Sequence, residues 1–222
     1  MDKVSPHKAL SLLALPGGFV FAYPFEIAPE EMKVGYKMVS FDTGKISNVT
    51  RSIYTLTKFG SEYKLFGKNI RNFLSCRSAL LNDGRVFVVE EDGKATLFDM
   101  NEYPAWEGKL TYQGDVPDCI AATQDSLWAA YSEKNTLVRY NLQTLREELR
   151  IGGNNSPFSN PVSIFPAGSK LFICNKESMD IWKIDTNDYT TELYYQFEEP
   201  VYDYKFIDKY EIVSLESGIY VL

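Results

Sequence analysis

The chain has 222 residues, a formal net charge of −7 and 45% hydrophobic residues, which is enough to bury a sizeable core in one or two domains. Its three cysteines are too few and odd in number for a disulfide framework, and they form no CxxC pair, which argues against a cysteine-based zinc site. No apolar run approaches the about 20 residues that a membrane-spanning helix needs, and the acidic balance argues against a nucleic-acid partner.

The chain begins with two apolar stretches, residues 9–15 and 18–23, on either side of Pro16 and Gly17. Basic residues precede them, so the N-terminus weakly resembles a secretory signal. Asp2 dilutes the basic region and the Pro-Gly-Gly sequence interrupts the apolar run. We therefore expect two β-strands here and a cytoplasmic protein, with secretion as the alternative.

A unit of similar pattern occurs five times along the chain. Its second strands align on Val20, Val86, Leu127, Leu171 and Ile212, with spacings of 66, 41, 44 and 41 residues. Each unit contains an apolar strand, a polar turn, and a further strand that in the first four units closes on Asp or Asn, which start turns well. Units of about 40–45 residues with four strands have the size of propeller blades.

The sequence therefore predicts an all-β, single-domain, five-bladed β-propeller. The expected blades cover residues 6–67, 70–114, 116–152, 160–198 and 200–222. The last unit stops after its third strand, so we expect residues 1–5 to supply its fourth strand and close the ring. No long helix is expected.

The first unit is about 22 residues longer than the others, through insertions at residues 24–33 and 44–60. Long insertions in a regular scaffold often have a function or form a contact between copies of the chain, and the alternative is simple decoration. Residues 45–77 carry a net charge of +6 and residues 177–216 a net charge of −8. Neighbouring blades either neutralise each other or present a patch that steers a charged partner.

Two of the units, Leu127–Asn141 and Leu171–Asp185, resemble the YVTN and NHL-type propeller repeats. Both contain an apolar strand, a polar tip and a second apolar strand that closes on Asn or Asp. The resemblance covers nearly the whole chain and implies a propeller. These families include many binding scaffolds and a few hydrolases or lyases, so the likeness leaves the activity open.

Residues at the start of each unit are expected to face the mouth of the central channel. The candidate binding residues there are His7, Arg71, Asn72, Asp118, Asn160, Glu199, Tyr202 and Asp203. Lactonase-like propellers hold a metal in this region, but here the carboxylates stand at different offsets. No P-loop, GxSxG, HExxH or EF-hand pattern occurs. We expect no metal, no cofactor and no catalytic residue.

A second candidate is Trp106, in the stretch 100–108 that is expected to form a long loop. An exposed tryptophan there would serve as an aromatic anchor for a partner. The leading hypothesis is a non-catalytic binding or scaffold module for a protein, peptide or carbohydrate ligand, with no nucleic acid and no membrane as partner. The alternative is a hydrolase or lyase that acts on a small sugar acid, lactone or glycan at the channel mouth.

Overall fold

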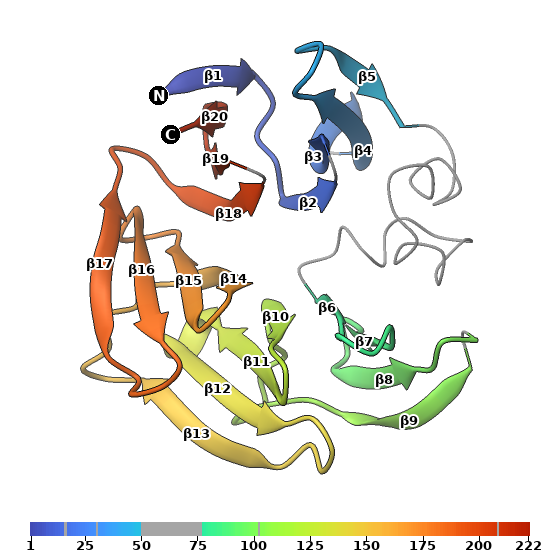
Figure 1. Ribbon diagram of the computed structural model, residues 1–222, viewed down its shortest axis with the longest axis vertical. Coiled ribbons are helices and arrows are strands. Elements are labelled where there is room, and N and C mark those ends of the chain that lie inside the picture. Colours follow the sequence, from blue (N-terminus) through green and yellow to red (C-terminus); the bar gives the residue numbers. More distant parts are fainter. Residues whose placement is uncertain (16, 30, 50–76, 102, 208) are drawn as a thin grey trace. The chain divides into compact units, whose positions relative to one another are not determined.

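The computed structural model describes residues 1–15, 17–29, 31–49, 77–101, 103–207 and 209–222. Within these ranges the chain forms five four-stranded sheets (Figure 1). They are the antiparallel blades of a five-bladed β-propeller, as the sequence predicts. The chain divides into two compact units, one formed by Met1–Leu74 with Tyr202–Leu222 and the other by Ser75–Val201.

The only helical element in the described ranges is a single 3-10 turn, η3 (Ser132–Lys134). Among the described residues, no helix has the length and apolar character needed to cross a membrane.

The first blade lies in the first unit and has the strand order β2-β3-β4-β5. Its strands are β2 (Ser11–Leu15), β3 (Gly18–Ala28), β4 (Glu31–Ser40) and β5 (Ile46–Asn48). Phe19, Val20 and Phe21 are fully buried, which explains why apolar residues fill consecutive positions of β3. A side chain at Gly18 would overlap the carbonyl oxygen of Val39, so glycine permits this close pairing of β3 with β4.

The last blade also lies in the first unit. Its strands are β18 (Val201–Ile207), β19 (Tyr210–Leu215), β20 (Gly218–Val221) and β1 (Asp2–Ser5). The N-terminal strand β1 runs antiparallel beside β20 (Figure 1), and Asp2 pairs with Val221. The prediction that residues 1–5 complete the last blade is confirmed. Gly218 has a φ of 149°, and a side chain there would overlap the carbonyl oxygen of Ser5.

The two blades of the first unit share one apolar core. Ala9, Phe19 and Phe21 pack with Ile212 and Ile219 of the last blade. Polar side chains join the same blades, because the Ser214 hydroxyl accepts from the Ala9 N–H at 3.0 Å and donates to the Ala9 carbonyl at 2.8 Å. Both groups are buried, so the bonds satisfy backbone groups that water cannot reach.

The second unit contains three blades. Their strands are β6 (Ser78–Leu80), β7 (Val86–Val89), β8 (Lys94–Phe98), β9 (Pro104–Lys109), β10 (Cys119–Ala122), β11 (Ser126–Tyr131), β12 (Thr136–Asn141), β13 (Glu147–Gly152), β14 (Pro161–Ala167), β15 (Lys170–Asn175), β16 (Asp180–Asp185) and β17 (Thr191–Gln196). Within this unit the first strand β10 adjoins the first strands β6 and β14 of the neighbouring blades. Cys119 and Cys174 are buried free thiols.

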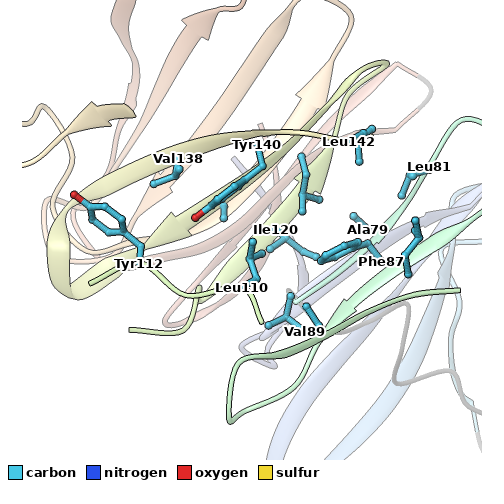
Figure 2. Packing of buried hydrophobic residues seen from close by; sticks show 14 of the residues in the cluster. Ala79, Leu81, Phe87, Val89, Leu110, Tyr112, Ile120, Val138, Tyr140 and Leu142 are labelled. Carbon is cyan, nitrogen blue, oxygen red and sulfur yellow. The ribbon is translucent and has the colours of Figure 1, made fainter. Parts of the chain in front are cut away.

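Side chains of neighbouring blades interlock in the second unit. Figure 2 shows residues of β6 and β7, such as Ala79 and Phe87, gathered with Ile120 of the next blade. Every residue of β11 is buried, since both faces of a second strand are covered by neighbours. The Tyr131 and Tyr140 hydroxyls lie 2.9 Å apart in this core. Burial and this hydrogen bond raise the pKa of Tyr131.

One strand differs from the sequence prediction. The stretch 100–108 is expected from the sequence to form a long loop, but β9, the fourth strand of the second blade, covers Pro104–Lys109. Trp106 therefore lies in a strand and not in a loop. It is half-buried, stacks on Phe87 with ring centroids 5.9 Å apart, and packs against the core. The expectation of an exposed loop anchor at Trp106 is wrong, because the indole packs on Phe87 of its own blade.

Candidate binding surface

The residues predicted for the channel mouth come from both units. Arg71 and Asn72 lie outside the described residues. His7, Tyr202 and Asp203 belong to the first unit, and Asp118, Asn160 and Glu199 to the second. The surroundings of each group are described within its own unit, and a shared channel-mouth site stays a prediction.

In the second unit the predicted polar residues support turns. The Asp118 carboxylate accepts from the Ser132 N–H at 3.0 Å and from its hydroxyl at 2.5 Å, which holds the start of η3. Asn160 has a left-handed φ of 57° and its N–H donates to the Asn135 side chain at 2.8 Å. Glu199 is half-buried. Asp118 and the Asn160 backbone therefore already have local hydrogen-bonding roles.

Asp203 is the most deeply buried of the predicted residues, with 1% of its surface exposed. One carboxylate oxygen accepts from the Leu12 N–H at 2.7 Å, and the other from the Tyr204 N–H at 2.9 Å and the Lys205 ammonium at 2.8 Å. Leu12 lies in the first blade and Asp203 in the last. The carboxylate therefore links two blades and satisfies two backbone donors.

Tyr202 belongs to a small surface cluster with Lys8 and Glu216. The Tyr202 hydroxyl donates to the Glu216 carboxylate, and the Lys8 ammonium donates to both partners. The ammonium also lies 4.3 Å from the centroid of the Tyr202 ring. The charges of Lys8 and Glu216 compensate each other, so this cluster offers little net attraction to a ligand.

His7, the one histidine of the chain, lies against the first blade. Its ring centroid is 4.6 Å from that of Tyr23, and its Nε2 accepts from the Lys37 ammonium at 2.5 Å. Burial and the nearby Lys37 charge lower the pKa of His7. His7 is therefore neutral at pH 7, and the Lys37 ammonium, which also lies 4.9 Å from the Tyr23 ring centroid, carries the positive charge.

The main irregularity of the described chain is an extension of the β3–β4 hairpin. The insertion predicted at residues 24–33 is a continuation of both strands, in which Pro24 pairs with Val34 and Phe25 with Lys33. Large apolar side chains are exposed on it: Phe25 is 38% exposed, Ile27 44%, Met32 59% and Val34 44%. We call residues 23–36 the hairpin extension.

Aromatic rings connect the hairpin extension to the core. Phe19, Phe21, Tyr23 and Phe25 are alternate residues of β3, and successive ring centroids lie 6.2, 5.9 and 5.8 Å apart. The first two rings are buried and the last is exposed. Because alternate strand residues share a face, the buried rings support the outer ones and hold the extension to the blade.

The second unit contains a polar cavity of about 410 Å³ between the β10–β13 blade and the β14–β17 blade, lined by Asp125, Trp128, Arg139, Asn187 and Tyr189 among others. The Arg139 guanidinium donates to the Ser126 hydroxyl at 2.6 Å and to the Tyr189 hydroxyl at 2.5 Å. Asp125 and Glu148 lie within ion-pair distance of it. This arginine is already neutralised, so the cavity has no strong charge for a ligand.

The residues that the structure describes contain no group of three or more His, Cys, Asp or Glu side chains placed to hold a metal ion.

Comparison with known proteins supports the architecture. No protein-family model and no curated protein matches the sequence. Among solved structures, the chain is similar to virginiamycin B lyase from Staphylococcus aureus, with a TM-score of 0.53 and 16% identity over 94% of this chain and 63% of that chain. It is also similar to the WD40 β-propeller domain of Doa1, with a TM-score of 0.55 and 10% identity over 95% of this chain and 61% of that domain's chain.

A third similar structure is the glutaminyl cyclase of Myxococcus xanthus, with a TM-score of 0.52 and 9% identity over 98% of this chain and 95% of that chain. The chain spans less than two thirds of the length of the lyase and of the Doa1 chain. Identities this low show the fold alone. They define the chain as a β-propeller, and the YVTN and NHL-type families stay a resemblance.

Sequence reasoning located the insertion but missed its aromatic ladder. The signal is visible as the alternation Phe19, Phe21, Tyr23 and Phe25, which is the period of a continuous strand. Pro24 concealed it, because proline inside an apolar run usually indicates the end of a strand.

Proposed function

We propose that the protein is a non-catalytic binding module that recognises a protein or peptide through the hairpin extension. The observation that carries this proposal is the exposure of Phe25, Ile27, Met32 and Val34 over the two faces of one short, rigidly supported element. Exposed apolar side chains that gather in one place mark interaction sites, whereas single ones are common on any surface.

Rigid support favours recognition by the hairpin extension. The ladder of rings from Phe19 to Phe25 anchors it to the core. A surface that is already ordered loses less conformational entropy when it binds. The likeness to a WD40 domain is compatible with this role, but it concerns the fold only.

The second hypothesis, a hydrolase or lyase at the channel mouth, has less support. The Asp118 and Asp203 carboxylates already accept hydrogen bonds from Ser132 and from Leu12, Tyr204 and Lys205. A metal or substrate would have to displace these partners. Mass spectrometry of the purified native protein tests this hypothesis, and a tightly bound metal ion would restore it.

The binding proposal is tested by selecting peptides from a random display library and measuring their affinity by fluorescence anisotropy. We expect binders whose affinity falls about tenfold or more in the double variant Ile27→Ser with Met32→Ser, since two buried apolar contacts are worth at least that much. Leu193→Ser is the matched control, because Leu193 is 50% exposed in the second unit. A library without binders, or binders that both variants affect equally, would contradict the proposal.

A further inference from the structure

In the hairpin extension, β3 and β4 extend beyond the ends of the neighbouring strands β2 and β5. In the first blade β2 pairs with β3 only along Gly18–Ala22, and β5 pairs with β4 only along Lys37–Val39. Among the described residues, no strand pairs with the outer edge of β3 beyond Ala22. None pairs with the outer edge of β4 from Glu31 to Gly35. Such edges carry backbone groups that can bond another chain.

The edge of β3 is protected by a proline. The Ala22 carbonyl accepts from the Leu10 N–H at 2.8 Å, so Ala22 directs its backbone groups outward. Because the direction alternates along a strand, the next residue that faces outward is Pro24. Proline has no N–H to donate, and prolines in sheets occupy such edge positions. This edge is therefore a poor template for a further strand.

The edge of β4 has no such protection. The Tyr36 carbonyl accepts from the Val49 N–H at 2.9 Å, so Tyr36 faces outward. By the same alternation, Val34 and Met32 also direct their N–H and carbonyl groups outward. Their spacing matches the spacing at which an added strand bonds.

The side chains along β4 indicate the chemistry of the added strand. Lys33 lies on the face of Phe25, and Lys37 on the same face four residues further along. Within the described part of the chain, neither lysine has a carboxylate within ion-pair distance. The opposite face presents Met32 and Val34, which are 59% and 44% exposed. A strand with acidic residues on one face and apolar residues on the other is complementary to both.

We propose that the outer edge of β4 binds an extended acidic segment of a partner protein as an additional β-strand. Its acidic side chains lie beside Lys33 and Lys37, and its apolar side chains cover Met32 and Val34. This inference rests on the proposed binding function and adds the mode of binding and the class of partner.

A second copy of the chain fits this edge less well. The Tyr36 carbonyl is already bonded on the outer side by the Val49 N–H, and β5 pairs with β4 from Lys37 onward, so two antiparallel β4 edges share only residues 31–35. Their longest overlap sets Lys33 opposite Lys33 of the other copy, and like charges directly opposite are destabilising. Five residues a side are also far fewer than the about 20–30 of a standard interface.

The first test uses a fluorescent six-residue peptide of alternating glutamate and valine, with its lysine–valine counterpart as control. Two further versions carry N-methyl groups on either the valines or the glutamates. We expect the acidic peptide to bind and the basic one to fail. One N-methylated version should lose binding and the other retain it, because only one set of N–H groups faces β4 in an added strand. Equal affinities of the two N-methylated peptides would overturn the proposal.

The second test changes the protein and uses the same acidic peptide. Val34→Pro removes an outward N–H and should lower affinity about fivefold relative to Val34→Ala, as expected for one hydrogen bond. Lys33→Glu should lower it about tenfold and allow the basic peptide to bind, since the charge beside the peptide is reversed. Lys45→Glu is the charge control, because Lys45 is exposed in the turn between β4 and β5.

The outcomes separate the two proposals. Library peptides that depend on Ile27 and Met32, but respond equally to Val34→Pro and Val34→Ala, would overturn strand addition and leave the binding function intact. Thermal unfolding of each variant shows whether it is folded. Equal effects of Lys33→Glu and Lys45→Glu on the acidic peptide would also overturn the proposal, because the attraction would then be a general effect of charge.

Discussion

Replacing Asp203 by alanine should destabilise the protein strongly. The carboxylate is 1% exposed and bonds the Leu12 and Tyr204 N–H groups and the Lys205 ammonium. Alanine leaves both donors without a partner, at a cost of about 1–3 kcal/mol each. It also leaves the half-buried ammonium of Lys205 unpaired. We expect the free energy of unfolding to fall by about 4 kcal/mol, in the range for breaking a buried ion pair.

Asp99→Ala is the matched control. The Asp99 carboxylate also accepts from two backbone N–H groups, those of Asn101 at 2.8 Å and Tyr103 at 2.9 Å, but in an exposed turn. Water replaces these bonds when the side chain is removed, so the expected loss is about 0.5 kcal/mol.

Urea unfolding followed by circular dichroism measures both variants. With a slope of about 2–3 kcal/mol per molar urea, Asp203→Ala should lower the midpoint by about 1.5 M and Asp99→Ala by far less. Equal midpoints for the two variants would refute the reasoning that burial makes Asp203 structural. A stable Asp203→Ala protein that no longer binds its ligand would instead support the predicted channel-mouth role.

In thermal unfolding, Gly218→Ala should lower the free energy of unfolding by about 2 kcal/mol more than Gly153→Ala does. Both glycines have positive φ, but only at Gly218 would the new side chain overlap β1. Equal losses of stability would contradict the pairing of β1 with β20. Tyr131→Phe should lower the free energy of unfolding by about 1 kcal/mol. Because the pKa of Tyr131 is raised in the folded protein, the wild type should lose stability as pH rises above about 10. Absorbance at alkaline pH that shows this ring ionising before unfolding would contradict its burial. The pKa of His7 is lowered by burial and by Lys37, so the midpoint of its NMR titration should lie below about 6.5 and should rise in Lys37→Gln. The stability of the wild type should decrease as pH falls below about 6.5. An unchanged midpoint in Lys37→Gln would exclude the contact between His7 and Lys37.

The five blades could be predicted because the strongest patterns belong to the most buried strands. Leu127 and Leu171 lie in strands covered on both faces, so nearly every residue there is apolar. The fourth strand of the second blade could not be located in this way. In β9, Ala105 and Glu107 are exposed and Trp106 is half-buried, and such an outer strand has a weak pattern.

The candidate site was harder to predict, because adjacent residues on one strand have different surroundings. Tyr202 and Asp203 are neighbours in β18 and were assigned the same role. Alternation places Tyr202 in a surface cluster and Asp203 in the core, and only the structure shows that the Asp203 carboxylate meets Leu12. Pro24 was misleading for a related reason, since its effect depends on whether its backbone faces a neighbouring strand or the open edge.

The pairing of β1 with β20 has a consequence for how the chain assembles. The second unit is one continuous segment, whereas the first unit joins two segments that are far apart in sequence. Strand β1 precedes its partner β20 by the strands of all five blades, so during synthesis it is present long before β20. Closing so long a loop costs little more entropy than closing one of half the length, but such distant contacts form slowly. Until then the edge of β20 is free to accept β1 of another molecule, so refolding at high protein concentration should favour strand-exchanged dimers.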